Sequence, residues 1–401
     1  MASSYDYAII GAGIIGLTLA REILTREPRA TIIILDKEPD IGRHGSGRNS
    51  GVLHSGIYYP EESLKAKVCS EGAQLMAQYC DEHQLPIARL GKVIVPTKPE
   101  DGPLLDLLMH RAQANGASIE MLDATELQNR EPSARTATGK ALFSPDTAVV
   151  EPMPILSHLL TALKNSGVAI QFNAKITNID AQHSQLTTNS GTYCYGWLFN
   201  SSGQYADRVG HLFGVGEHYT MLPFKGIYYR LAPTSQVVCN GLIYPVPDLK
   251  VPFLGVHYTK KINGDVYVGP TAVPALGREH YHRLQGLNIN ESIPILLRLA
   301  QQYALNRQGF RHFSHSEALR IFRSKFTEAA RLLTPALKRE DLLVCNKVGI
   351  RAQLLDTRKH ELVMDFVIEN GSSSTHVLNA ISPAFTSSMS FAKYILDSMS
   401  N

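Results

Sequence analysis

The stretch that decides the fold is YDYAIIGAGIIGLTLAREILTREPRATIIILD, residues 5–36. Its apolar run at 5–10 leads directly into the glycine pattern GAGIIG at 11–16, and a helical pattern follows as far as Glu27-Pro28. A second apolar run at 31–35 ends in Asp36. A strand, a G-x-G-x-x-G turn, a helix and a second strand closed by an acid are typical of the βαβ unit that binds a dinucleotide.

The glycines have separate roles in such a unit. Gly11 makes the tight turn, Gly13 lets the backbone approach a pyrophosphate, and Gly16 lets the helix pack closely on the strand. The helix N-terminus offers its N–H groups and the positive end of its dipole to the phosphates. Asp36 accepts hydrogen bonds from both ribose hydroxyls and would repel a 2′-phosphate, which argues against NADP.

A polar, glycine-rich loop, GSGRNSGVLHSGIYY at residues 45–59, follows shortly after Asp36. Taken alone it has the composition of an ordinary surface loop. Its place next to a nucleotide unit favours a loop laid along the cofactor, because glycines let a backbone pass close to a ligand. The candidate cofactor-binding residues are therefore Gly11, Gly13, Ile14, Ile15, Gly16, Asp36, Lys37, Ser46, Arg48, Asn49, Ser50, Gly51, Val52, Ile176, Gly203, Pro383 and Ala384.

The rest of the chain indicates two interleaved domains, since 401 residues exceed one simple core. Alternating helical and strand-like stretches return the chain to the first sheet, so we expect an α/β, Rossmann-like nucleotide domain made of residues 1–85, 150–220 and 335–401. Aromatic and β-branched runs after residue 221 predict a substrate domain, residues 86–149 and 221–334, on a large mixed or antiparallel sheet. Within it, Asn263-Gly264 predicts a two-residue hairpin turn. Helical patterns predict helices over 293–305 and 316–333, and Asp123 with Glu126 predicts a capping box at the start of another helix. The fold class is α/β locally and α+β overall.

The composition excludes several classes of protein. A net charge of +3, from 39 Lys+Arg and 36 Asp+Glu, gives no basic run for nucleic acid. Five scattered cysteines without metal-like spacing indicate reduced thiols and no metal site. No run reaches the roughly 18 apolar residues of a membrane span. We therefore expect a cytoplasmic protein, or one attached peripherally to the inner membrane.

The dinucleotide is more consistent with FAD than with NAD. An NAD enzyme of this size normally keeps its nucleotide domain contiguous, whereas this chain leaves the sheet and comes back to it. FAD is also long, so its isoalloxazine ring needs a second platform beyond the βαβ unit. The glycine-rich loop at 45–56 could cover the pyrophosphate and reach the ring.

At the level of whole motifs, the chain resembles the L-2-hydroxyglutarate oxidase/dehydrogenase family, within the D-amino-acid-oxidase-like flavoproteins. The stretches that carry the resemblance are GIIG after GAG, GRNSGVLHSGIYY, LKAKVCSEG, PFKGIYYRL, LIYPVPD, PFLGVHYT, VGPTAV, GIRAQ and HVLNAISPAFTSS. Thr271, Ile381 and Phe385 depart from the residues usual in that family.

The resemblance implies noncovalent FAD and oxidation of a 2-hydroxy dicarboxylate, L-2-hydroxyglutarate, to 2-oxoglutarate by hydride transfer from C2 to flavin N5. It also implies that the electrons pass to oxygen or, in bacterial respiratory members, to a quinone. Cys345 could carry a covalent cofactor link, although a buried structural thiol is the simpler interpretation.

Oxidising a 2-hydroxy acid needs a carboxylate anchor and a base. Arg351 matches the position where related flavoenzymes hold the substrate carboxylate, and its planar fork suits bidentate binding. His54 is the candidate base because histidine titrates near neutral pH. His257 is the second candidate, and it could instead bind a carboxylate.

A dicarboxylate also needs a second cation, and Lys225 and Arg48 are both candidates. Each could equally neutralise a phosphate or form a salt bridge. Four tyrosines could line the pocket or belong to the core: Tyr58, Tyr59, Tyr228 and Tyr244. Two other functions remain open, an amine or amino-acid oxidase that uses Arg351 and a non-catalytic dinucleotide-binding redox sensor.

Overall fold

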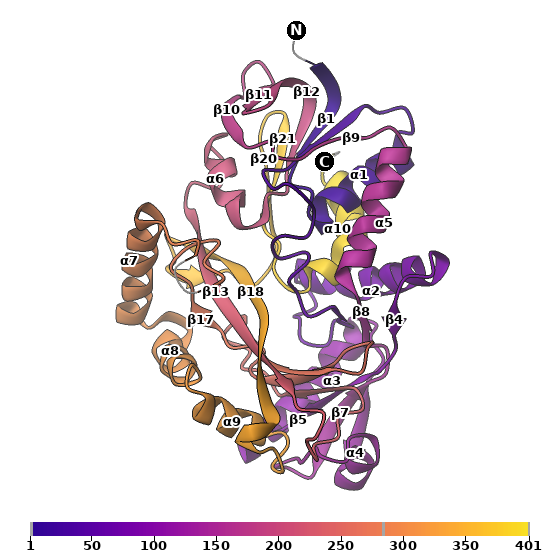
Figure 1. The fold of residues 1–401 in the computed structure, drawn as a ribbon, viewed down its shortest axis with the longest axis vertical. Helices are drawn as coiled ribbons and strands as arrows, with labels where there is room; N and C mark the ends of the chain where they lie inside the picture. Colours follow the sequence, from indigo (N-terminus) through magenta and orange to yellow (C-terminus); the bar gives the residue numbers. More distant parts are fainter. Residues whose placement is uncertain (1–2, 283–284, 400–401) are drawn as a thin grey trace.

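The computed structural model describes residues 3–282 and 285–399, which form two large sheets surrounded by helices (Figure 1). The predicted architecture is confirmed. A Rossmann-like unit is interleaved with a second, mixed sheet that carries most of the remaining strands.

The eight-stranded sheet contains the βαβ unit. β1 (Ser3–Ile10) pairs in parallel with β2 (Ile32–Leu35), and α1 (Ile14–Arg26) connects them. The other strands are β9 (Ala169–Gln171), β10 (Ile176–Asp180), β11 (Gln185–Thr188), β12 (Gly191–Asn200), β20 (Val367–Asn370) and β21 (Ser374–Asn379). Because β12 pairs in parallel with β1 and with β21, the chain returns to this sheet after each excursion.

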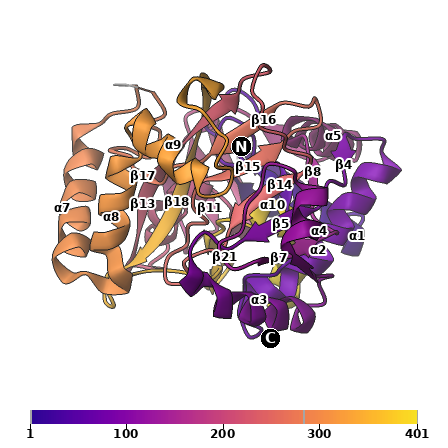
Figure 2. The ribbon, with the colours of Figure 1, turned by 90° about the horizontal axis from the view of Figure 1, so that it is seen from below.

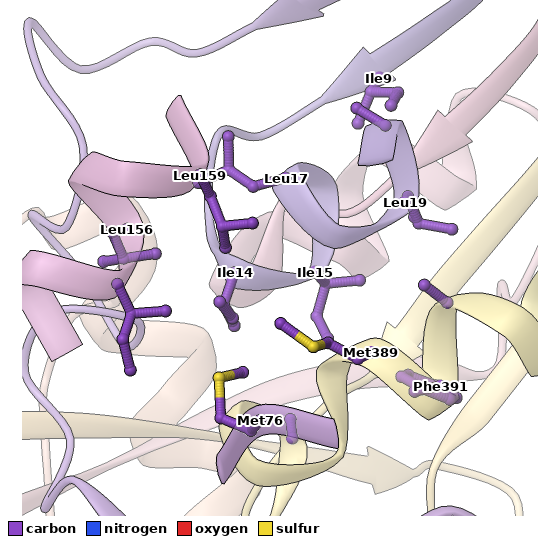
Figure 3. Packing of buried hydrophobic residues seen from close by; sticks show 14 of the residues in the cluster. Ile9, Ile14, Ile15, Leu17, Leu19, Met76, Leu156, Leu159, Met389 and Phe391 are labelled. Atoms are coloured by element: carbon purple, nitrogen blue, oxygen red, sulfur yellow. The ribbon is translucent and has the colours of Figure 1, made fainter. Parts of the chain in front are cut away.

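Three helices pack on α1 or on one another beside this sheet, namely α2 (Leu64–Glu82), α5 (Pro152–Asn165) and α10 (Ala384–Asp397). Figure 3 shows the apolar core that they share, with Ile14, Ile15 and Leu17 of α1, Met76 of α2, Leu156 and Leu159 of α5, and Met389 and Phe391 of α10. This core fixes the N-terminus of α1, where the glycine turn lies.

The ten-stranded sheet forms the lower half of the molecule in Figure 1. Its strands are β5 (Lys92–Val95), β6 (Glu120–Asp123), β7 (Lys140–Ser144), β13 (Tyr219–Leu231), β14 (Leu242–Pro245), β15 (His257–Lys260), β16 (Val266–Gly269), β17 (Val273–Pro274), β18 (Leu342–Asp356) and β19 (Glu361–Leu362). A small third sheet contains β3 (Val52–Leu53), β4 (Ile87–Ala88) and β8 (Ala148–Val150). It brings part of the glycine-rich loop into the core.

The remaining helices are α3 (Gly102–Ala114), α4 (Ala124–Arg130), α6 (Ala206–His211), α7 (Ile289–Leu305), α8 (Phe310–Leu319) and α9 (Arg323–Arg331). Short 3-10 turns lie at Pro99–Asp101, Gly203–Tyr205, Arg307–Gly309 and Arg339–Asp341. Figure 2 shows α7, α8 and α9 on the side of the molecule opposite α1 and α5.

Three expectations from the sequence need correction. Residues 335–401 do not all join the nucleotide sheet, because β18 and β19 pair within the ten-stranded sheet. The helix expected over 316–333 is divided into α8 and α9. The hairpin between β15 and β16 is closed by Lys261 N–H donating to Asp265 O across three residues, with Gly264 at φ +87°.

Candidate active site

A cavity of about 900 Å³ is lined by residues of both large sheets. Most of the predicted residues line it: Gly11, Gly13, Ile14, Ile15, Asp36, Lys37, Ser46, Arg48, Asn49, Ser50, Val52, His54, Ile176, Gly203, His257, Arg351, Pro383 and Ala384. Gly16, Gly51 and Lys225 do not line it. The glycine turn and the catalytic candidates therefore face one continuous space.

Glycine is required at the turn between β1 and α1. Gly11 has φ +105°, and a Cβ there would lie 2.6 Å from Ser201 O. A Cβ on Gly16 would lie 2.0 Å from Gly11 O, so Gly16 permits the helix to follow the strand this closely although it does not face the cavity. By contrast, a Cβ at Gly45 or Gly203 would meet no atom within 4 Å, which leaves open space along this wall of the cavity.

Asp36 and Ser46 hold the turn in place. The Asp36 carboxylate accepts hydrogen bonds from the N–H groups of Ala12, at 2.8 Å, and Glu38, at 2.9 Å. Ser46 Oγ accepts from Ile14 N–H at 2.9 Å, which ties the glycine-rich loop to the start of α1. The two hydrogen bonds therefore fix the orientation of the Asp36 carboxylate at the wall of the cavity.

The glycine-rich loop is held mainly by its own side chains. Asn49 donates to Ser46 O at 2.7 Å and accepts from Gly51 N–H at 2.8 Å, and Ser50 Oγ accepts from Val52 N–H. Gly51, at φ +72°, faces away from the cavity, and a Cβ there would lie 2.2 Å from Val150 O. Its role is therefore in folding the loop onto the strand that carries Val150.

Two predicted cations are occupied by other contacts. The Lys37 ammonium bonds Glu38 and, at 2.5 Å, Glu279. The Arg48 guanidinium donates to Arg43 O at 2.6 Å and lies 4.2 Å from the centroid of the Tyr281 ring. The contacts of Arg48 do not resemble those of a free anchor for a second carboxylate, and Lys37, predicted as a cofactor contact, is paired with acids.

The Lys37 contact belongs to a charged cluster at one end of the cavity. His44 Nε2 lies 2.9 Å from Glu38 and 3.8 Å from Glu279, and the Tyr205 hydroxyl donates to Glu279 at 2.8 Å. One carboxylate oxygen each of Glu38 and Glu279 and one ring nitrogen of His44 lie within 4.8 Å of one another. The Lys37 ammonium already neutralises part of this acidic group.

His54 lies at the other end and is 5% exposed. Burial, and then the charges of Lys92, His257 and Arg351, lower its pKa well below the ordinary value. Among the described residues its Nδ1 has no hydrogen-bond partner. A neutral imidazole that faces the cavity is suited to accept a proton.

His257 is also buried and neutral. Its Nδ1 lies 2.8 Å from Gly255 O, and since a carbonyl only accepts, Nδ1 carries the proton and Nε2 is an acceptor. Its ring stacks on Tyr244 at a centroid distance of 3.8 Å. Burial lowers the pKa of His257 to about 3. Both histidines therefore remain candidates for the base.

Arg351, the predicted carboxylate anchor, lines this end of the cavity. Within residues 3–282 and 285–399 it forms no ion pair, and Nη1 donates to Pro252 O. The guanidinium lies 5.1 Å from the centroid of the Phe253 ring. A desolvated guanidinium without an acid is costly unless an anion binds it.

The prediction for Lys225 is wrong with respect to this cavity. Along β13, Phe224, Gly226 and Tyr228 line the cavity, whereas Lys225 and Ile227 line a separate pocket. Successive residues of a strand point to opposite faces, so the neighbour of a cavity residue points away from it.

Sequence reasoning missed two buried lysines near the catalytic end. Lys65, in α2, is 5% exposed, and Lys92, in β5, is 1% exposed. Each lysine lies within an otherwise ordinary amphipathic or apolar pattern. The one available sequence signal is that a lysine occupies a position whose spacing predicts burial. Cys345 donates to Tyr228 O at 3.1 Å and does not line the cavity, which is consistent with a structural thiol.

The cavity fits FAD, because the glycine turn, Asp36 and the open wall at Gly45 and Gly203 lie at one end and the acid–base candidates at the other. This fold and site define a dinucleotide-dependent oxidoreductase with a second, ten-stranded sheet on the other side of the cavity. The model of the family described as FAD dependent oxidoreductase matches residues 6–398.

Relatives of known name match over nearly the whole chain. The mitochondrial L-2-hydroxyglutarate dehydrogenase of Caenorhabditis elegans is 35% identical, with 98% of this chain and 92% of that protein covered. The L-2-hydroxyglutarate dehydrogenase of Escherichia coli (strain K12) is 33% identical over the same shares. The chain thus belongs to the FAD dependent oxidoreductase family and groups there with L-2-hydroxyglutarate dehydrogenases, and the choice of FAD over NAD is confirmed.

Solved structures confirm the fold. The dithionite-reduced L-alpha-glycerophosphate oxidase from Mycoplasma pneumoniae with FAD bound superposes with a TM-score of 0.77 at 20% identity, covering 100% of this chain and 95% of that one. Glycine oxidase from Geobacillus kaustophilus gives a TM-score of 0.71 at 17% identity, covering 99% and 94%.

Proposed function

We propose that this protein oxidises L-2-hydroxyglutarate to 2-oxoglutarate with noncovalent FAD. The observation that carries the proposal is that Arg351, which has no acid partner among the described residues, lines the same cavity as two neutral histidines. The names of the relatives support the choice of substrate.

In this proposal Arg351 binds the carboxylate next to the reacting carbon through its planar fork. His54 accepts the proton of the C2 hydroxyl, since it is neutral and faces the cavity. His257 Nε2 accepts a second hydrogen bond or replaces His54 as base. When bound, FAD supplies the acceptor for the C2 hydride.

Residues Gly11, Gly13 and Asp36 would hold the nucleotide end of FAD, and the loop at 45–52 would cover its middle. Pro383 and Ala384 stand at the start of α10, whose positive dipole end faces the cavity. A helix N-terminus at that place stabilises negative charge on a bound group.

Anaerobic mixing tests this function directly. The purified holoenzyme should be yellow, and L-2-hydroxyglutarate should bleach its flavin absorbance while the D-enantiomer does not. Bleaching by an amino acid with none by L-2-hydroxyglutarate would instead identify an amino-acid oxidase on the same fold. A protein that purifies without flavin would leave only the redox-sensor or binding function.

We propose further that the electrons pass to oxygen or a quinone, in a cytoplasmic protein that touches the inner membrane. Among the described residues, no helix is long and apolar enough to cross a membrane. The face of α7 that points to solvent is nevertheless apolar, with Ile289, Ile293 and Leu297 75%, 53% and 66% exposed. Patches of this kind mark contact surfaces for membranes or other partners.

Sedimentation with vesicles tests this contact. The Ile293→Gln/Leu297→Gln variant should lose binding to vesicles of anionic phospholipid while it keeps its flavin and its reduction by substrate. Equal sedimentation of the variant and the native protein would rule out α7 as the contact.

A further inference from the structure

Three buried polar atoms near the catalytic end lack any hydrogen-bond partner within the described part of the chain: His54 Nδ1, the Tyr58 hydroxyl and Lys92 Nζ. Lys92 Nζ lies 4.7 Å from the centroid of the Tyr58 ring and 5.5 Å from that of Tyr244. Buried polar groups are normally paired, so unpartnered polar atoms gathered in one place indicate the binding of a polar ligand.

The ten-stranded sheet places Lys92 on the face that carries the substrate candidates. Lys92 pairs with Leu242, and two residues further along the same strands Ile94 pairs with Tyr244. Side chains of directly paired residues share a face, and so do residues two apart on one strand. Tyr244 in turn stacks on His257, so Lys92, Tyr244 and His257 belong to one face of the sheet.

Two cations therefore belong to the surroundings of the neutral histidines. Arg351 lines the same cavity as His54 and His257, and Lys92 Nζ lies 5.5 Å from the centroid of the Tyr244 ring that stacks on His257. The charges of both cations help to lower the pKa values of His54 and His257. Neither cation has an acid partner among residues 3–282 and 285–399. Asp365, the acid that acts on nearby Lys65, already accepts from the backbone N–H groups of Leu64 and Lys65.

The energetic cost of burying Lys92 and Arg351 without anions indicates which kind of ligand this part of the protein binds. Burial lowers the pKa of Lys92 to about 7, as expected for an ammonium without an anion. A monocarboxylate would neutralise Arg351 alone and leave Lys92 unpaired. A dicarboxylate laid across the sheet face would bring an anion to each cation.

We propose that Lys92, with the Tyr58 hydroxyl, binds the second carboxylate of a dicarboxylate substrate and so determines the substrate class. Arg351 holds the first carboxylate, and the proposal rests on the function proposed above. Lys92 is 1% exposed, and neither it nor Tyr58 or Tyr244 lines the cavity. The rings of Tyr58 and Tyr244 lie beside Nζ, so they must part for the carboxylate to enter.

Binding of unreactive acids tests the subsite apart from catalysis. Glutarate has two carboxylates and pentanoate has one on a chain of the same length, and neither carries a hydroxyl to oxidise. Each is titrated into the holoenzyme while the flavin absorbance is followed. The native protein should bind glutarate more tightly than pentanoate by about tenfold or more, because an added charged hydrogen bond is worth a factor of that size.

The Lys92→Met variant should lose this preference, with a weaker affinity for glutarate and an unchanged affinity for pentanoate. Lys225→Met is the matched control, because Lys225 points away from the cavity, and it should leave both affinities unchanged. Tyr58→Phe keeps the ring and should weaken the binding of glutarate but not that of pentanoate. This variant therefore tests the subsite if Lys92→Met does not retain FAD.

An unchanged glutarate-to-pentanoate ratio in both Lys92→Met and Tyr58→Phe would overturn the subsite. A native protein that binds both acids equally would do the same. Reduction of the native flavin by L-2-hydroxyglutarate is scored separately, so a failure of the proposed reaction is distinguished from a failure of the subsite.

Discussion

His54 shows how burial turns an ordinary side chain into a candidate base. Its lowered pKa means that the neutral, proton-accepting form persists as the pH falls below the ordinary value of 6.5. The acid limb of kcat/KM for L-2-hydroxyglutarate should therefore have its midpoint below 6.5. Stopped-flow flavin reduction between pH 5 and 8 provides the measurement.

The His54→Asn variant should reduce flavin roughly 10²–10⁴ times more slowly, the usual contribution of a general base. Its flavin content is the control for folding. If the variant reduces flavin at the native rate, His257 becomes the base.

Arg351 should act on substrate rather than on the cofactor. We expect Arg351→Ala to weaken substrate binding by about 1.5–3 kcal/mol, the value of a charged hydrogen bond, and to leave FAD bound. Substrate KM and flavin stoichiometry are the two measurements. Arg358→Ala, at an exposed position just beyond the end of β18, is the matched control. Unchanged kinetics in Arg351→Ala would contradict the anchor role.

At the scale of elements, the crossing of α2 and α10 depends on one glycine. A Cβ on Gly72 would lie 2.6 Å from Ser387 Cα and 2.6 Å from Ser390 Oγ. The two helices can approach this closely only without a side chain at that point. They contain Lys65 and the α10 N-terminus, so their contact also positions the wall of the active site.

Gly72→Ala should destabilise the protein by roughly 1–3 kcal/mol, because overpacking outweighs the better helix propensity of alanine. Thermal unfolding of the holoenzyme measures the effect. Gly102→Ala, also at a helical glycine, is the matched control, since its Cβ would meet only Thr138 Cγ2 at 3.6 Å. A melting temperature of Gly72→Ala equal to or above the native value would contradict this account.

The boundaries of α4, α8 and α9 show which local sequence signals are sufficient to predict where a helix begins or ends. The capping box of Asp123 and Glu126 was predicted from the sequence, and both hydrogen bonds are present at the start of α4. The break between α8 and α9 was missed because no proline or glycine marks residues 316–333. Local chemistry predicts the start of a helix better than an interruption that packing imposes.

At the scale of the whole molecule, a charged cluster joins the two halves around the cavity. Lys37 and Glu38 follow β2 of the nucleotide sheet, whereas Glu279 belongs to the segment after β17. The pKa values of Glu38 and Glu279 are lowered, in part by the Lys37 ammonium. Their contribution to stability is therefore present above the unfolded pKa of about 4.5 and is lost as the pH falls through the folded values.

Glu279→Gln should lower the free energy of unfolding by about 1 kcal/mol at pH 7, since the cluster is partly exposed and solvent screens it. The difference from the native protein should shrink towards pH 3. Urea unfolding at both pH values measures this change. Glu328→Gln, which breaks an exposed pair with Lys325, is the control and should have a smaller effect. Equal stability of Glu279→Gln and the native protein at pH 7 would contradict the role of the cluster.

The sequence by itself determined the nucleotide unit, since Gly11, Gly13, Gly16 and Asp36 act within one short βαβ stretch whose local geometry they specify. Tertiary structure alone decided the catalytic end. It turned Lys225 away from the cavity, divided residues 335–401 between two sheets and brought Lys92 to the same face as His257. The physical reason is that the face of a strand depends on its register and on the strand beside it. Register is set by pairing between segments that are far apart in the chain.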